Sequence, residues 1–460
     1  FPDKTYYPIS SRNSKDFINL MRVYLDAVFR PLIYEKSEIF RQEGWHYELA
    51  EDGTLSRKGV VYNEMRGAFA DADELEEDAI MRALYPDTPY RFVSGGDPEH
   101  IPELTYERFL DFHRRFYSPS NAYVYLDGDV DIDEVLGILD GEYLSGFAAG
   151  ERIPVSELQK PVRAPEQRVV YELPAEEDPR ERYRLAWGRV AGEITDRVRM
   201  TAMQLLCNVL CGNNQSVLTR EMLAAGLGEA VSMMLWDGCA QPFIKLEVRN
   251  ISEDKLARAG EKLRDVLGGL AENGLDRREL EAAMANLEFQ MRERDFGYYP
   301  QGLGISFGVL DSWLHGGEPE ALVEVGTLFD TLRARMEEGY FEELIRSVLL
   351  ENPHACEVVM VPSHTAGEER RERDAKELER LAASWSEAER GRVRSQQAAL
   401  DAWQGSSDSP EALAALPRLE LSDISPEPEE YPTRTDELGG VTLLVGDAMF
   451  PGDTLFAGSM

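Results

Sequence analysis

The chain has 460 residues, 43% of them hydrophobic, with 85 acidic and 49 basic side chains and a formal net charge of −36. This composition predicts roughly two to four globular domains and argues against a nucleic-acid partner, because a phosphate backbone would be repelled. No window approaches the ~18 apolar residues of a membrane span, so no membrane partner is expected. The acidic charge favours basic partners, and solubility alone is the alternative explanation.

The cysteines indicate the compartment. There are four of them, too few for a disulfide framework and without a C-x-x-C pair: Cys207, Cys211, Cys239 and Cys356. We therefore expect the cytoplasm or another reducing soluble compartment. Cys207 and Cys211, four residues apart in an apolar helical segment, are predicted to be core residues.

Residues 1–147 predict an α+β domain with an incomplete sheet. The strand pattern occurs at residues 5–9, 45–49 and 122–126. Helices are predicted at residues 14–29, 35–44, 105–116 and 131–143, and an acidic stretch at 71–78 precedes a helix that ends before Pro86. Because the strand at 5–9 has no earlier partner, we expect an uncovered sheet edge or groove.

A second α+β domain is predicted at residues 169–362, after a linker at 148–168 that is rich in Pro, Glu and Arg. Strands are predicted at 169–173, 182–190, 230–235, 243–248 and 355–361, and helices at 196–211, 218–225, 254–272, 276–294 and 341–350. The helix, turn and strand of residues 341–361 repeat the order found at 106–126. The predicted fold class is thus α+β, with two tandem, homologous domains of mainly antiparallel sheet packed by helices.

The composition becomes highly charged after Pro362. Residues 363–430 predict a helical hairpin and a linker, with helices at 368–383 and 387–403. Ser386 and Glu389 have the spacing of a capping box at the start of the second helix. A strand at 441–445 then begins a third domain over residues 431–460.

Residues 57–69 predict a helix on which Glu64 lies on or beside an apolar face formed by Val60, Val61, Met65, Ala68 and Phe69. An unpaired carboxylate buried there would cost several kcal/mol, so a partner is expected. An ion pair with Arg41 or Arg66 is one solution, and a metal ion is the other.

The residues around Glu64 carry a family resemblance. The run VVYNEMRG at 60–67, with QEGWHYEL at 42–49, SGGDP at 94–98 and IPELT at 101–105, resembles the presequence-protease and falcilysin branch of the pitrilysin family of zinc metallopeptidases. FGYYPQGL at 296–303 extends the resemblance into the second domain. The resemblance implies that Glu64 is the distal zinc ligand of the full-length protein.

The same resemblance implies that two further zinc ligands and the general base come from an H-x-x-E-H helix. This sequence has six histidines, and none has a Glu and a second His at that spacing. We therefore expect no catalytic residue, no bound zinc and no activity in this chain alone. The resemblance assigns residues 1–147 to the rear of the catalytic-type domain, residues 169–362 to a non-catalytic domain, and the hairpin to a hinge.

For the full-length protein, the resemblance implies degradation of unfolded peptides in a closed chamber. Its partners would be peptide substrates, basic ones included, and the remaining portions of the same polypeptide. The alternative is a non-catalytic member of the family, a peptide-binding or scaffolding subunit that needs a catalytic partner. A degenerate H-x-x-E-H helix encoded upstream of Phe1 would favour that alternative, and an intact helix would favour the enzyme.

Overall fold

A computed structural model describes residues 1–150, 152–154, 157–294, 296–322, 325–427, 433–437, 441–445 and 448–451. The chain divides into two compact units, one of Phe1–Pro8 with Tyr24–Ser407 and the other of Ile9–Val23 with Asp408–Met460. Each unit is described by itself. Within the described residues, no helix is long and apolar enough to cross a membrane.

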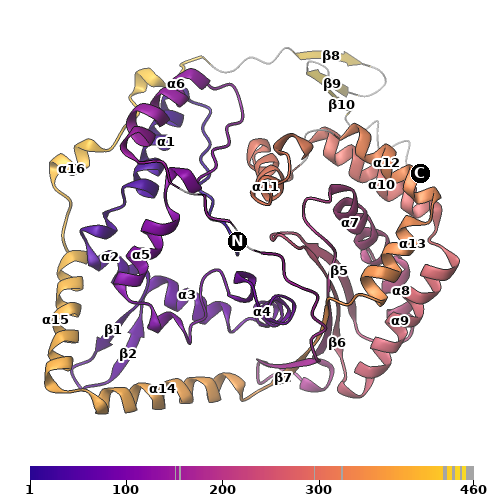
Figure 1. Ribbon diagram of the computed structural model, residues 1–460, viewed down its shortest axis with the longest axis horizontal. Coiled ribbons are helices and arrows are strands. Elements are labelled where there is room, and N and C mark those ends of the chain that lie inside the picture. The colour runs from indigo at the N-terminus through magenta and orange to yellow at the C-terminus, as the bar shows by residue number, and fades with distance from the viewer. Residues whose placement is uncertain are drawn as a thin grey trace. The chain divides into compact units, whose positions relative to one another are not determined.

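The larger unit is built around a five-stranded sheet in the order β3-β7-β4-β6-β5 (Figure 1). Its strands are β3 (Gln167–Glu172), β4 (Tyr183–Val190), β5 (Ala230–Trp236), β6 (Phe243–Ile251) and β7 (Ala355–Ser363). Only β3 and β7 run parallel, and the other pairs are antiparallel. In the centre, Trp187 of β4 pairs with Leu246 of β6 and with Glu357 of β7. The predicted α+β class with mainly antiparallel sheet is confirmed.

Helices cover one face of this sheet (Figure 1). They are α7 (Arg197–Cys211), α8 (Val217–Ala224), α9 (Leu256–Asn273), α10 (Arg277–Glu293), α12 (Gly326–Glu337) and α13 (Tyr340–Leu344). Their apolar sides form the main core with the sheet, where Leu206, Leu263 and Phe341 are fully buried. Each such side chain contributes about 1.5–3 kcal/mol of transfer free energy. The predicted helices of the second domain are confirmed, with shifts of one or two residues at their ends.

The opposite face of the sheet is covered by α4 (Ala72–Leu84), which precedes the sheet by more than eighty residues in the chain. Ile80, Leu84 and Tyr85 are fully buried there against strands β4 and β7. The ring Nε2 of buried His354 lies 2.7 Å from the Leu84 carbonyl oxygen and fastens the end of the helix. The helix also buries Glu76 beside Lys245 of β6.

The start of α4 differs from the prediction, which placed a helix after the acidic stretch 71–78. The acidic residues are in the helix itself, because Asp71 caps it by accepting a hydrogen bond from the Asp73 N–H. Carboxylates in the first turn are favourable next to the positive end of the helix dipole. Acidity was therefore a signal for the helix start and not for a separate segment.

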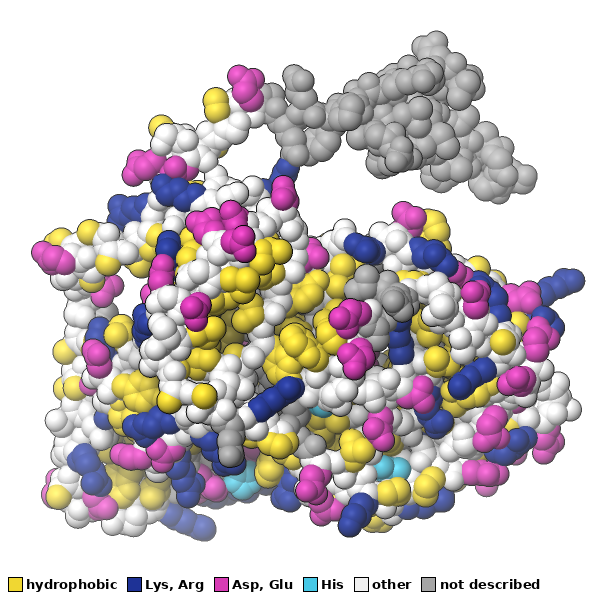
Figure 2. Space-filling model, turned by 45° about the horizontal axis from the view of Figure 1, so that its top comes forward, with side chains coloured by type: hydrophobic (Ala, Val, Ile, Leu, Met, Phe, Trp, Pro, Cys, Tyr) yellow, Lys and Arg dark blue, Asp and Glu magenta, His cyan; other side chains and the backbone are white. Residues whose placement is uncertain are grey.

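The remaining elements of residues 1–147 are mostly helical. They are α1 (Ser14–Phe29), α2 (Ser37–Glu43), α3 (Val60–Ala68), α5 (Tyr106–Phe116) and α6 (Ile132–Ile138), with a two-stranded sheet of β1 (His46–Leu49) and β2 (Leu55–Lys58). The predicted strands at residues 5–9 and 122–126 are wrong, since neither segment is assigned as a strand. A strand needs the ladder hydrogen bonds of a neighbour, and among the described residues these two segments have none. Apolar side chains stay exposed instead, including Phe112, Val124, Ile132 and Leu136, and Figure 2 shows hydrophobic side chains on one face of the molecule.

A helical hairpin of α14 (Ala366–Ser384) and α15 (Glu387–Gln404) follows the sheet, as predicted. Ser386 and Glu389 form the predicted capping box. Val393 of α15 packs on Leu49 and Leu55 of the small sheet. Arg370 and Arg371 of α14 pair with Glu172 of β3, so the hairpin touches both sheets of this unit.

The smaller unit contains α16 (Pro410–Ala415) and the three-stranded order β10-β9-β8, from β8 (Thr433–Glu437), β9 (Val441–Val445) and β10 (Ala448–Pro451). The predicted strand at 441–445 is confirmed as β9. Within this unit, Lys15 forms an ion pair of 2.6 Å with Asp423. The rest of the predicted linker and third domain, residues 428–432, 438–440, 446–447 and 452–460, lies outside the described residues.

Candidate functional site

Glu64 lies on α3, a helix that begins directly after strand β2. Gly59 makes this junction with φ +142°, where an added Cβ would collide with the backbone of Gly44 and Trp45. The close approach therefore requires glycine at this position. Tyr62 and Met65 are buried and hold α3 against the protein, whereas Glu64 is exposed.

The expectation that Glu64 sits beside a buried apolar face is wrong. Val60, which was assigned to that face, is itself 50% exposed. The proposed ion pairs are absent too: Arg41 pairs with Glu38, and Arg66 lies over the Tyr62 ring. Over the described part of the chain, Glu64 has no hydrogen-bond or ion-pair partner. The carboxylate is solvated, so it needs no partner for stability, and it remains free to accept one.

The zinc assignment can be tested against the donor set. Catalytic zinc generally takes three protein ligands and a water molecule. Among the described residues, no three His, Cys, Asp or Glu side chains come together to hold a metal ion. Glu64 alone does not make a zinc site, so no chemical step is derived through zinc from these residues.

A second feature is the free edge of the five-stranded sheet. Strand β5 pairs with β6 on one side and with no described strand on the other. In an antiparallel edge strand, every second residue points its N–H and C=O groups away from its neighbour. Side chains of β5 alternate between buried (Val231, Met233) and exposed (Ala230, Ser232, Met234). Such an edge is a template for an added strand.

An open groove of about 320 Å³ runs between β5 and α7. Met203, Leu206 and Leu210 turn the apolar side of α7 into the core and leave Gln204 and Asn208 exposed. The groove is lined by Gln204, Cys207, Asn208, Gly212, Met233, Met234, Leu235 and Asp237. Its mixture of amide, thioether and carboxylate groups can contact both apolar and polar side chains of a ligand.

The predicted core role of the two helical cysteines is borne out by their surroundings. Cys207 is buried and Cys211 is half-buried. Burial raises the pKa of the Cys207 thiol far above its usual range and that of Cys211 to about 12. Neither is a thiolate near neutral pH, so neither is a nucleophile.

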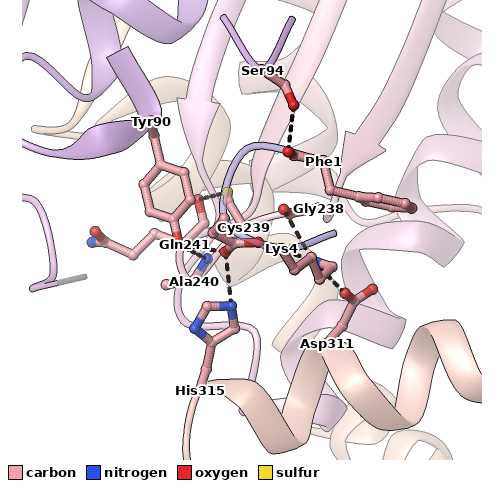
Figure 3. Close-up of polar contacts among 11 residues, drawn as sticks. Phe1, Lys4, Tyr90, Ser94, Gly238, Cys239, Ala240, Gln241, Asp311 and His315 are labelled. Atoms are coloured by element: carbon pink, nitrogen blue, oxygen red, sulfur yellow. Dashed lines mark hydrogen bonds and ion pairs between the residues drawn. The ribbon is translucent and has the colours of Figure 1, made fainter. Parts of the chain in front are cut away.

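The β5–β6 turn next to the groove is held by the first residues of the chain (Figure 3). The Lys4 ammonium lies 2.8 Å from the carboxylate of Asp311, on α11 (Gln301–Leu314), and 3.1 Å from that of Asp3. Asp3 also accepts a hydrogen bond from Tyr90 and pairs with His315 at 3.2 Å. Burial would raise the pKa of Asp3, but the hydrogen bonds and the Lys4 charge outweigh it, and the pKa is lowered.

Asp237 stands apart from this network. It is exposed, it ends the groove, and no cation in the described residues forms an ion pair with it. Withdrawal of water by the surrounding protein, together with the charge of Asp311, raises its pKa. Sequence reasoning did not single out Asp237. The Asp-Gly pair at 237–238 directly after a strand is a turn signal that would have placed it at the end of β5.

Comparison with known proteins gives two family matches. Residues 103–287 match the family described as Peptidase M16 inactive domain, and residues 360–449 match a family described as associated with subfamily C of the M16 peptidases. The fold is also that of a protease from Helicobacter pylori, with a TM-score of 0.50 and 15% identity over 66% of this chain and 70% of that chain.

Curated relatives align over nearly the whole chain. Protein HypA of Clostridium perfringens is 36% identical over 97% of this chain and 46% of its own length. Presequence protease 1, chloroplastic/mitochondrial, of Arabidopsis thaliana is 34% identical over 99% of this chain and 43% of its own length. The chain thus spans less than half the length of these relatives.

The fold and the matched segments define an M16-type peptidase segment that contains the inactive-type domain. The chain belongs to the pitrilysin, or M16, family of metallopeptidases, in its presequence-protease branch.

Proposed function

We propose that this chain is the peptide-binding part of a zinc metallopeptidase that degrades unfolded peptides, with Glu64 as the distal zinc ligand of the full-length protein. The observation that carries the proposal is the exposed, unpartnered Glu64 carboxylate on α3, within the Asn-Glu-Met segment that resembles the family motif. The other two ligands and the general base would come from residues that this sequence does not contain. The chain alone would therefore not cleave peptides.

The free edge of β5 supports peptide binding by strand addition. An extended peptide placed beside β5 would satisfy its outward N–H and C=O groups, and its alternate side chains would face the groove along α7. Main-chain hydrogen bonds are insensitive to side-chain identity, so this mode suits an enzyme that takes many unfolded peptides. The net charge of −36 would favour basic ones.

The remaining portions of the polypeptide are the second proposed partner. The exposed apolar side chains of residues 1–147 would be covered by them, since contiguous exposed apolar surface marks an interaction site. The segment at residues 296–303 would line the wall of a closed peptide chamber, with Tyr298 fully exposed. The four free cysteines of the described residues support a reducing compartment.

The alternative is a non-catalytic peptide-binding or scaffolding member that needs a catalytic partner. It is favoured by one observation: the described residues offer a binding edge and only one recognisable zinc ligand. The two functions differ in the sequence upstream of Phe1, which encodes an intact H-x-x-E-H helix only in the enzyme.

Peptide hydrolysis distinguishes them. It is measured on this chain, on the full-length protein, on full-length Glu64→Gln and on full-length Glu74→Gln, which changes an exposed glutamate of α4. Glutamine nearly preserves the shape and removes the charge. We expect activity in the full-length protein and in Glu74→Gln, none in this chain, and a loss of at least about 100-fold in Glu64→Gln. Chelator-sensitive cleavage by this chain alone, or full activity of Glu64→Gln, would overturn the assignment.

A further inference from the structure

The groove beside β5 ends at a negative charge that the protein leaves uncompensated. Asp237 follows the last residue of β5 and lines the groove. Its neighbour Asp311 is also acidic, and each carboxylate raises the free energy of the other. Two carboxylates with one available cation create a local demand for a second cation.

Lys4 cannot meet that demand, because its ammonium is already shared. It pairs with Asp3 and Asp311 and contacts the Gly238 carbonyl oxygen at 3.5 Å (Figure 3). Its side chain is only 6% exposed, which fixes it in this position. The described residues therefore balance Asp311 internally and leave Asp237 open to the groove.

The geometry of an added strand brings a side chain to this place. Side chains on one face of a strand recur about every 6.6–6.8 Å, twice the rise per residue. A peptide beside β5 would thus present one side chain along Met234 and Cys207 and the next near the end of the strand, at Asp237. The first surface is apolar and the second is anionic.

We propose that Asp237 is a specificity-determining residue that binds the Lys or Arg side chain of an extended peptide added to the edge of β5. This inference rests on the proposed function, since it assumes that peptides bind at that edge. The preferred ligand is an unfolded segment in which a basic residue stands two positions from an apolar one. The raised pKa of Asp237 agrees with a carboxylate whose charge is waiting for a cation.

Binding of labelled ten-residue peptides to the full 460-residue chain tests the proposal. Three peptides are compared: one with a central Lys two positions from Leu, the same peptide with Gln for Lys, and the Lys peptide with N-methyl groups on alternate backbone nitrogens. We expect the Lys peptide to bind roughly tenfold more tightly than the Gln peptide, as for a charge-assisted hydrogen bond. N-methylation should abolish binding, because it removes the main-chain donors.

The protein variants separate the two ideas. Asp237→Asn should reduce the Lys preference to less than about twofold, and Asp237→Lys should favour a Glu-bearing peptide instead. Asp265→Asn, which changes an exposed aspartate of α9, should keep the wild-type preference. An unchanged preference in Asp237→Asn overturns the specificity role and leaves strand addition standing. Failure of every peptide to bind, or indifference to N-methylation, overturns both.

Discussion

The Glu76 carboxylate of α4 lies 3.0 Å from the Lys245 ammonium of β6, and Glu76 is fully buried. A pair this close would ordinarily lower the pKa of the acid. Burial and the nearby charge of Glu247 outweigh the attraction of Lys245 and raise the pKa of Glu76 to about 7. The interface between helix and sheet therefore prefers the protonated acid.

This relationship predicts a pH-dependent stability. The folded-state pKa of Glu76 exceeds its unfolded value, so its contribution is fully present below about pH 4.5 and is lost as pH rises through about 7. Glu76→Gln mimics the protonated form and should equal the wild type at pH 5. At pH 8 it should be more stable by up to about 3 kcal/mol.

Urea unfolding of both proteins at pH 5 and pH 8 measures this difference, with the exposed Glu74→Gln as a control that should show no pH-dependent change. A loss of several kcal/mol in Glu76→Gln at pH 8 would show instead that the ion pair with Lys245 dominates.

The packing of α4 predicts a large cost for Leu84→Ala. Leu84 is 0% exposed between α4 and the sheet, so the substitution leaves a cavity and should lower the free energy of unfolding by about 2–5 kcal/mol. Leu136→Ala on α6 makes the same chemical change at a side chain that is 53% exposed, and it should cost less than about 1 kcal/mol. Similar losses in the two variants would mean that α4 does not contribute to the sheet's core in solution.

The capping box of α15 predicts a smaller effect. Ser386 accepts a hydrogen bond from the Glu389 N–H and Glu389 accepts one from the Ser386 N–H. Ser386→Ala removes the first of these and should destabilise the hairpin by about 1 kcal/mol. Ser384→Ala, at the exposed end of α14, is the matched control and should have a smaller effect. Thermal unfolding followed by circular dichroism compares them.

The buried thiols predict slow modification. Burial raises the pKa of both Cys239 and Cys356 to about 12. Neither should react with a thiol reagent at pH 8 in the folded protein, and both should react once the chain is unfolded in denaturant. Rapid labelling of Cys356 under native conditions would contradict its place in the core.

The sequence predicted the second domain well because its signals are local. Alternation in residues 243–248 and the apolar side of residues 196–211 each specify an element without reference to distant residues. The capping box at Ser386 was equally local. Such patterns identified the strands of the large sheet and the helices on one of its faces.

What the sequence could not supply was partnership. Residues 5–9 and 122–126 have strand-like patterns, but a strand exists only where a neighbour completes its ladder. The exposure of Glu64 depended on which side of α3 the rest of the protein covers, and Tyr62 decided that. The cover provided by α4 was likewise unpredictable, since helical periodicity shows that a face is apolar and not what lies against it.

The parallel pairing of β3 with β7 has a consequence for synthesis. Glu172 ends β3 and pairs with Ser363 at the end of β7, so about 190 residues must be made after β3 before its partner is complete. At roughly 5–20 residues per second, β3 waits on the order of 10–40 s on the ribosome. During that interval its hydrogen-bonding groups are open to other chains, and this edge is where we expect a chaperone to act on the nascent protein.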